Sequence, residues 1–254
     1  MAVPFILYNN IYENGTLTAF SESPGFDIEN IIDWRSYVRW KATSATTQTI
    51  DLDYGSSVPS DAFGVSGHTL SGSTISIQVS ATGAWAGEQT TVPGTSFALS
   101  DNLDICKSFS SVSSRYWRFL IQSPSATPEI GVLCLGARLD FPKNPNRPLS
   151  FVDESMEVTS RRSKNGHILG ATTYYRPYSV IMSFSWLQIS FVQGDLYTFW
   201  STHGSLLKPF FLQVNIDEWD VGRFVQLPEN YRFKEVFDDY TFTTDLQMTF
   251  EGIL

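Results

Sequence analysis

The chain has 254 residues, of which 42% are hydrophobic, 15% aromatic and 17% charged, a length that suits two domains of about 100 to 200 residues each. Its net charge of −9 argues against a nucleic-acid binder, which needs clustered Lys and Arg. The longest apolar runs fall far short of the roughly 20 residues that cross a bilayer, and the amino terminus lacks the basic segment of a signal peptide. We therefore expect neither membrane insertion nor secretion by that route.

The first half of the chain predicts antiparallel strands. Apolar and polar residues alternate in short stretches separated by Gly, Pro, Ser and Asp, which is typical of strands with one buried face. In the stretch 115–122 this places Trp117, Phe119 and Ile121 on one face. The other clear stretches are 48–53 and 74–80. A short helical turn is predicted over 27–33, where Asp27 stands at the capping position.

A proline-rich seam divides the chain. Three prolines fall within residues 141–148, and proline blocks both helices and central strands. We predict a first domain over residues 1–142, a Pro-rich linker over 143–149 and a second domain over 150–254. The halves differ in charge, since residues 1–142 hold 7 basic and 13 acidic residues and residues 143–254 hold 10 and 13.

The second half predicts long strands interrupted by one helix. Strands are predicted over 174–190, over 210–216 and in a final alternating stretch, 246–254. Between them, apolar residues recur at helical spacing from Phe191 to His203, and Gly204 follows as a stop signal. The predicted fold class is therefore all-β, with a β-sandwich followed by a β-barrel or sheet that carries one amphipathic helix.

Cysteine and histidine give no metal-binding pattern. Cys106 and Cys134 suit small core positions, with a single disulfide as the alternative. His68, His167 and His203 are scattered, so no metal and no cofactor is expected. A calcium ion held by backbone carbonyls stays open, because it leaves too faint a trace in a sequence.

No set of residues assembles a catalytic mechanism. The segment 64–67 is not a nucleophile elbow, because its second glycine comes one residue early. Asp217, Glu218 and Asp220 flank an aromatic residue and are the strongest candidate acids, with a solvated turn as the alternative. We expect no catalytic residues and no enzyme activity.

Sugar binding asks for less: an exposed aromatic ring and a few fixed polar groups. Trp34, Arg35 and Tyr37 supply both within four residues, and Trp85 occupies a glycine-flanked loop. The alternative for each ring is a place in the core, which we favour for Trp40. The sequence thus predicts carbohydrate contacts at Trp34, Arg35, Tyr37 and Trp85.

At these residues the first half resembles a discoidin domain, the galactose-binding-like jelly roll. The matching stretches are 29–33 leading to Arg39-Trp40, 48–55 and 115–119. The resemblance implies a jelly-roll β-sandwich in which Asp33 and Trp40 are mainly architectural. The end-to-end disulfide of extracellular members is missing.

More narrowly, the chain resembles discoidin-like tail-tip proteins of tailed bacteriophages. The residues concerned are 67–70, 115–118 and 130–136 in the first half, and 163–166, 174–177, 195–200 and 207–211 in the second. The resemblance implies a distal tail or baseplate-hub protein of the virion, assembled in the host cytoplasm. Its partners would be further copies of itself in a ring, hexameric by that resemblance, together with the tail tube protein and the tail-tip or hub proteins.

Aromatic residues of the second half suit such a ring. A barrel of about 105 residues cannot bury so many rings alone, so we predict subunit contacts at Phe210, Phe211, Phe224 and Phe237. The primary hypothesis is a structural tail-tip ring with a peripheral jelly roll. The alternative is a carbohydrate-binding module that recognises a host cell-surface polysaccharide during adsorption.

Overall fold

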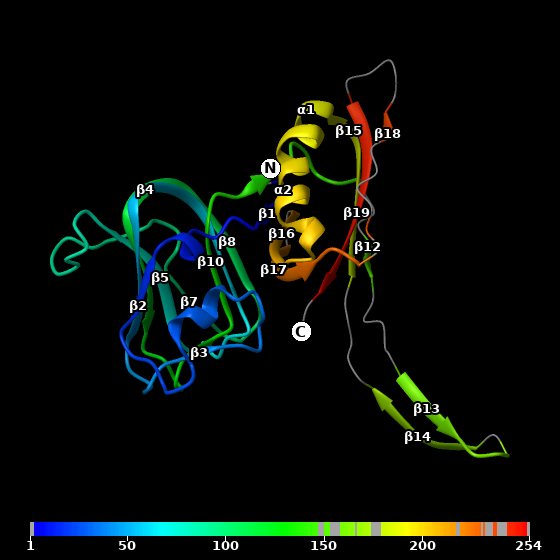
Figure 1. The fold of residues 1–254 in the computed structure, drawn as a ribbon, viewed down its shortest axis with the longest axis horizontal. Coiled ribbons are helices and arrows are strands. Elements are labelled where there is room, and N and C mark those ends of the chain that lie inside the picture. Colours follow the sequence, from blue (N-terminus) through cyan, green and yellow to red (C-terminus); the bar gives the residue numbers. More distant parts are fainter. Residues whose placement is uncertain are drawn as a thin grey trace. The chain divides into compact units, whose positions relative to one another are not determined.

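The computed structural model divides the chain into two compact units (Figure 1). The described residues are 3–146, 150–152, 158–165, 167–173, 179–216, 219–229, 231, 236–237 and 243–252. Unit 1 comprises Met1–Phe141 and Phe210–Phe224, and unit 2 comprises Pro142–Pro209 and Val225–Leu254. Residues 210–224, which the sequence assigns to the second domain, thus group with the first. Independent folding of residues 1–142 and 150–254 stays a prediction.

Unit 1 contains an antiparallel β-sandwich formed by one sheet folded over itself. Its strands are β2 (Thr16–Ala19), β4 (Gln48–Ser66), β5 (Thr74–Ser80), β6 (Thr90–Thr91), β7 (Phe97–Ala98), β8 (Ile105–Gln122) and β10 (Val132–Gly136). The first half of β4 pairs with β2 and the second half of β8, whereas its second half pairs with β10 and the first half of β8. The β4–β8 register shifts between Asp53 and Val58, and β4 curves over the top of the sandwich there (Figure 1).

Alternation of side chains explains why these strands form a sandwich. Ile50 and Leu52 are buried between the layers while Asp51 points outward to pair with Arg118. Burial of each large apolar side chain contributes roughly 1.5–3 kcal/mol. Trp40 is fully buried as expected, and its Nε1–H donates to the Ser21 carbonyl at 3.2 Å. The predicted all-β, jelly-roll class is confirmed.

Short helical turns complete the sandwich. They are η1 (Ile11–Asn14) and η2 (Ile28–Ile32), and a small two-stranded sheet pairs β3 (Trp40–Lys41) with β9 (Glu129–Ile130). The predicted turn at 27–33 is therefore present as a 3-10 helix. Asp27 stands at the N-cap position as predicted, but its side chain makes no capping bond, and the Glu22 carboxylate accepts the Ile28 N–H at 2.8 Å instead.

A second set of paired strands in unit 1 brings residues near the amino terminus beside residues about 200 positions later in the sequence. Its strands are β1 (Phe5–Leu7), β11 (Leu139–Asp140), β16 (Phe210–Ile216) and β17 (Trp219–Gln226), the last of which continues into unit 2. β1 pairs with β11 on one side and with β16 on the other, so that Leu7 lies opposite Phe211. Residues 210–224, here called the docking hairpin, then pack on the sandwich. A Cβ at Gly64 would lie 2.5 Å from the Phe211 ring. A Cβ at Gly222 would lie 2.4 Å from the Cβ atom of Cys106.

The two cysteines lie under the docking hairpin. Cys106 and Cys134 are buried and free, and both pair with Gly64 from neighbouring strands. Two strand spacings put their Cα atoms about 10 Å apart, beyond the roughly 7 Å that a disulfide spans. Burial raises the pKa of both thiols. Their prediction as small core residues is confirmed.

Gly64→Ala should lower the unfolding free energy by about 1–3 kcal/mol, because the added methyl group collides with the Phe211 ring. Thermal or denaturant unfolding measures this change. Gly194→Ala is the matched control, since a Cβ there meets no atom within 4 Å. Equal stability of the two variants would contradict the tight approach of the docking hairpin.

Unit 2 is built on a sheet with a separate ribbon. The sheet holds β12 (Ser150–Val152), β15 (Ser179–Gln188), β18 (Val236–Phe237) and β19 (Thr243–Gly252), and the ribbon pairs β13 (Val158–Arg162) with β14 (Ile168–Thr173). β15 pairs with β12 and β19, and β18 also pairs with β19. The predicted strand over 174–190 is present from Ser179 onward, and 174–178 lie outside the described residues.

One amphipathic helix covers residues 189–202, as predicted. It runs through α1 (Ile189–Phe191), a π-helical turn η3 (Val192–Leu196) and α2 (Tyr197–Thr202), and η4 (Gly204–Leu206) follows. Val192, Leu196 and Phe199 are its buried side chains. Gly204 does not adopt the left-handed conformation; it allows the Leu227 side chain to approach. No helix in the described part of the chain has the length and apolar character of a membrane span.

His203 should make stability depend on pH. Its Nε2–H donates to the Pro209 carbonyl at 2.7 Å, and burial lowers its pKa from 6.5 to about 4. The unfolded chain therefore binds a proton as the pH falls below about 6.5 while the folded chain does so only near 4. Stability contributed by neutral His203 is present above pH 6.5 and is lost as the pH falls towards 4, by about 3 kcal/mol.

The measurement is the unfolding free energy between about pH 7 and pH 4 for the natural chain and for His203→Gln, which keeps a donor for Pro209. The variant should show a shallower pH dependence. Identical slopes would contradict the assignment.

Candidate glycan-binding site

Four loops meet at one end of the sandwich, here called the loop end. They are residues 20–47, 67–73, 98–104 and 123–131. Strand register brings them together, because Gln48 pairs with Ile121, Thr74 with Gln122 and with Ala98, Ser66 with Val132 and Trp40 with Ile130. Three of the loops contribute side chains to one polar network.

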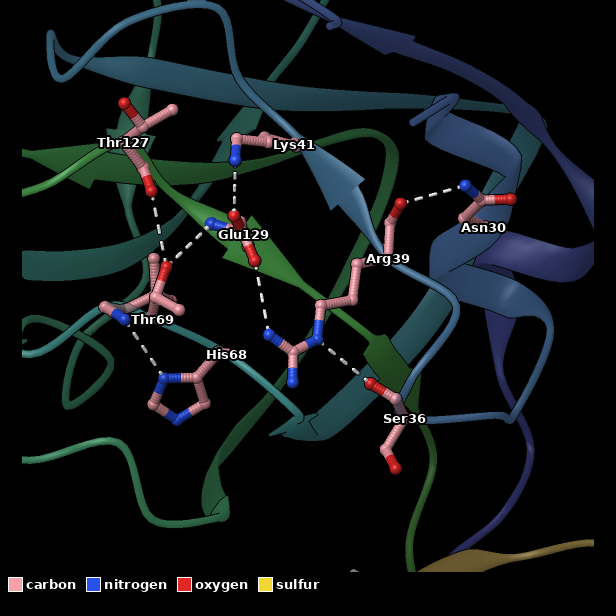
Figure 2. Close-up of polar contacts among 9 residues, drawn as sticks. Asn30, Ser36, Arg39, Lys41, His68, Thr69, Thr127 and Glu129 are labelled. Atoms are coloured by element: carbon pink, nitrogen blue, oxygen red, sulfur yellow. Dashed lines mark hydrogen bonds and ion pairs between the residues drawn. The ribbon is translucent and has the colours of Figure 1, made fainter. Parts of the chain in front are cut away.

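Glu129 is the centre of that network (Figure 2). One carboxylate oxygen accepts from Arg39 Nη1 at 3.2 Å and the other from Lys41 Nζ at 2.8 Å. These partners, Lys41 first, lower the pKa of Glu129. Thr69 Oγ1 accepts the Glu129 N–H at 3.0 Å and donates to the Thr127 carbonyl at 3.3 Å. The network connects β3 to the loops that carry Thr69 and Glu129.

Tyr37 projects from a loop whose backbone is fixed. Its side chain is 72% exposed, whereas the preceding Ser36 is 7% exposed. A Cβ at Gly67 or Gly131 would lie 2.4 or 2.2 Å from the Ser36 carbonyl oxygen, so only glycine fits beside it. Arg39 Nε donates to the same carbonyl at 3.3 Å. The exposed ring is therefore presented on a rigid support.

Two cations lie beside exposed aromatic rings at the loop end. The Arg35 guanidinium carbon is 5.9 Å from the Tyr37 ring centroid, and Lys41 Nζ is 5.6 Å from that of Phe26, which is 40% exposed. Arg35 also pairs with Asp33, and this hydrogen bond lowers the pKa of Asp33. An exposed ring with polar groups at its edge is the arrangement that stacks on a sugar ring and binds its hydroxyl groups.

The structure separates the four predicted sugar contacts. Arg35 and Tyr37 lie at the loop end. Trp34 is 6% exposed, has φ of 66°, stacks on Phe224 at 6.4 Å and donates from Nε1 to Glu13. In this conformation it offers no ring face to a sugar, and it supports the loop from within.

Trp85 lies at the other end of the sandwich. It follows the end of β5 at Ser80, which pairs with Tyr116, while the loop end adjoins the start of that strand. Its ring covers the Arg118 guanidinium at 4.0 Å, and Glu88 organises the loop by accepting bonds from Ser80 and Thr82. Those bonds, Ser80 first, lower the pKa of Glu88 to about 2. Trp85 and Tyr37 thus belong to different sites.

The predicted subunit-contact residues are placed as follows. Phe210, Phe211 and Phe224 are fully buried within the chain itself, and the Phe237 side chain lies outside the described residues. A role in subunit contacts stays a prediction for all four. Asp217 and Glu218 also lie outside the described residues, as does the Asp220 side chain.

The side chains of His68 and His203 have structural partners, whereas His167 is exposed and bonds to Ser163 through its backbone. His68 Nε2–H donates to the Leu103 carbonyl at 2.8 Å while its Nδ1 accepts the Leu70 N–H, and burial lowers its pKa. His68 therefore joins two loops of the loop end, in line with the structural role that the resemblance implies. The described part of the chain holds no cluster of side chains suited to a metal ion.

Sequence reasoning missed Phe26, Arg39, Lys41 and Glu129. Arg39 and Glu129 are 90 positions apart, so no local pattern links them. Arg39 and Lys41 flank the buried Trp40 in the sequence, which is the one local signal that pointed here.

Comparisons with known proteins returned solved structures only. A scan of protein-family models and a search of curated protein sequences found no match. Chitosan-binding module 1 of a Paenibacillus sp. IK-5 chitosanase/glucanase is 21% identical, with a TM-score of 0.45, and covers 50% of this chain and 98% of the module. Module 2 of the same enzyme, in complex with chitotriose, is 19% identical, with a TM-score of 0.44, and the match covers 50% of this chain and 99% of the module. CpGH89CBM32-5 from Clostridium perfringens, in complex with GalNAc-β-1,3-galactose, is 16% identical, with a TM-score of 0.43, and the match covers 51% of this chain and 100% of that protein.

Proposed function

We propose that unit 1 is a carbohydrate-binding module whose contact surface is the loop end. The observation that carries this proposal is Tyr37, a 72% exposed ring on a buried, glycine-clamped backbone. Holding a large apolar ring in water has no benefit for folding, whereas a sugar stacked on it removes that surface from water. The Arg39–Glu129–Lys41 network beside it offers hydrogen bonds in a fixed geometry, which limits the entropy lost on binding.

We propose that binding occurs without turnover. His68 and His203 both donate to backbone carbonyls, and the second ring nitrogen of His68 accepts the Leu70 N–H, so neither nitrogen of His68 is placed to take a proton from a nucleophile. A cell-surface polysaccharide of a host cell is the ligand class that fits the adsorption hypothesis.

Tyr37→Ala should weaken polysaccharide binding about tenfold, which corresponds to ~1.4 kcal/mol, because the stacking ring is lost. Unfolding stability should change by less than about 0.5 kcal/mol, since the ring is exposed. Affinity electrophoresis or calorimetry against a panel of bacterial cell-surface polysaccharides measures the first effect. Tyr37→Phe keeps the ring and should retain binding.

Trp40→Ala is the control for fold, and it should cost about 3–5 kcal/mol because its ring is fully buried. Polysaccharide binding that is unchanged in Tyr37→Ala, or absent across the panel in the natural chain, would refute the loop-end proposal.

A second proposed function is assembly into a homo-oligomeric ring at the tip of a phage tail, between tail tube and tip proteins. The observation in its favour is the ribbon of β13 and β14, which pair with no other strand in the described residues. A lone two-stranded ribbon is marginally stable in water, so a partner surface would stabilise it. Residues 158–173 contain three Lys or Arg and no acidic residue in a chain of net charge −9, which suits contact with another copy.

Sedimentation or native mass measurement tests this proposal. The natural chain should assemble, and replacing Arg161, Arg162 and Lys164 with Glu should shift it to monomer by charge repulsion. A natural chain that stays strictly monomeric at high concentration would overturn the ring proposal and leave the glycan proposal untouched.

A further inference from the structure

Unit 1 contains a pocket of about 370 Å³ between residues 97–107 and the docking hairpin. Its volume falls in the range of roughly 300–1,000 Å³ that is usual for small-molecule sites. The hairpin contributes Gly222 and Arg223 to it, so one side of the pocket comes from a segment that is distant in the sequence. None of the expected site residues lines it.

The pocket combines apolar walls with charges of both signs. Phe97, Leu99 and Leu103 are its apolar residues, and Asp101, Asp104, Lys107 and Arg223 are its charged ones. Lys107 Nζ lies 5.9 Å from the Phe97 ring centroid. Two acidic and two basic residues therefore line one small space.

This balance of charge selects for a neutral ligand. A small anion entering the pocket meets the carboxylates of Asp101 and Asp104, and a small cation meets Lys107 and Arg223. A hydroxyl group both donates and accepts, so vicinal hydroxyls satisfy a carboxylate and a cation at the same time. The apolar walls suit the C–H face of a sugar ring.

Hydrogen bonds within the chain hold the two carboxylates in place. Asp104 accepts from Ser66 Oγ at 2.7 Å and from the Phe224 N–H at 2.9 Å. Asp101 accepts the Leu103 N–H at 3.0 Å, and His68 binds the Leu103 carbonyl. Burial raises the pKa of Asp104 and lowers that of Lys107. Perturbed groups of opposite charge in one cavity are typical of functional sites.

We propose that this pocket is a second sugar site, which takes a single neutral hexose or N-acetylhexosamine ring. It deepens the proposed glycan-binding function and uses residues other than those around Tyr37. Phe224 connects the two regions, because its N–H binds Asp104 and its ring stacks on Trp34 beneath the Tyr37 loop. One glycan-binding unit would then hold two sites of different shape, an exposed ring and a half-open pocket.

The test is an NMR titration of the full, isotope-labelled chain with D-galactose, D-glucose and N-acetyl-D-galactosamine. We expect at least one sugar to shift the backbone amides of residues 99–107 and 222–223. Ala98→Phe fills the pocket from a strand position that keeps its backbone pairing with Thr74, and it should abolish these shifts. Lys107→Met keeps the contact with Phe97 and should weaken binding about tenfold. Tyr37→Ala, the matched control, should leave the shifts intact.

Each contrary outcome identifies what fails. Shifts confined to residues near Tyr37 would overturn the pocket proposal and leave the loop-end site standing. Pocket shifts that persist in Ala98→Phe, or no pocket shift with any of the three sugars, would also overturn it. Polysaccharide binding that is unchanged in Tyr37→Ala would instead refute the proposed function, and the pocket would be judged by its own shifts.

Discussion

The packing of the docking hairpin against the sandwich is the contact on which unit 1 depends. Phe211 lies over Gly64, and only a residue without a side chain leaves room for that ring. Strand β16 of the same hairpin pairs with β1. The hairpin also supplies a hydrogen-bond donor to Asp104 and covers both cysteines. A sheet face that would otherwise lie open to water is thereby buried, and the hydrophobic contribution to stability follows from the area removed.

The loop end inherits its rigidity from this packing. Trp34, three residues before Tyr37, stacks on Phe224 of the hairpin and holds a left-handed backbone conformation, which is strained for any residue other than glycine. On its other side the loop is held by Gly67 and Gly131, which pack closely against the Ser36 carbonyl. An exposed tyrosine ring is thus carried on a support that is largely core, which is how a binding surface avoids losing entropy when the ligand arrives.

Local sequence pattern predicted the elements well and their assembly less well. Alternation identified β4, β5 and β8, and helical spacing identified residues 189–202, because burial of one face leaves a periodic record. It did not reveal that β16 pairs with β1, since the partners are about 200 residues apart and pairing leaves no local signature. Nor did it tell Trp34 from Tyr37, because the turn that buries one ring and exposes the other depends on a backbone conformation rather than on composition. The sequence pattern also did not reveal the Arg39–Glu129 pair or the pocket at Asp104, because each is formed by segments that are far apart in the sequence.

The most direct test of this account is the thiol reactivity of Cys106 and Cys134 in the full chain and in a fragment of residues 3–142, which lacks the docking hairpin. In the native full chain both thiols should react slowly with an aromatic disulfide reagent, since they are buried and burial raises their pKa. In the fragment both should react rapidly, with loss of Tyr37-dependent glycan binding. A fragment that keeps its thiols protected and its stability unchanged would contradict the claim that residues 210–224 complete the sandwich.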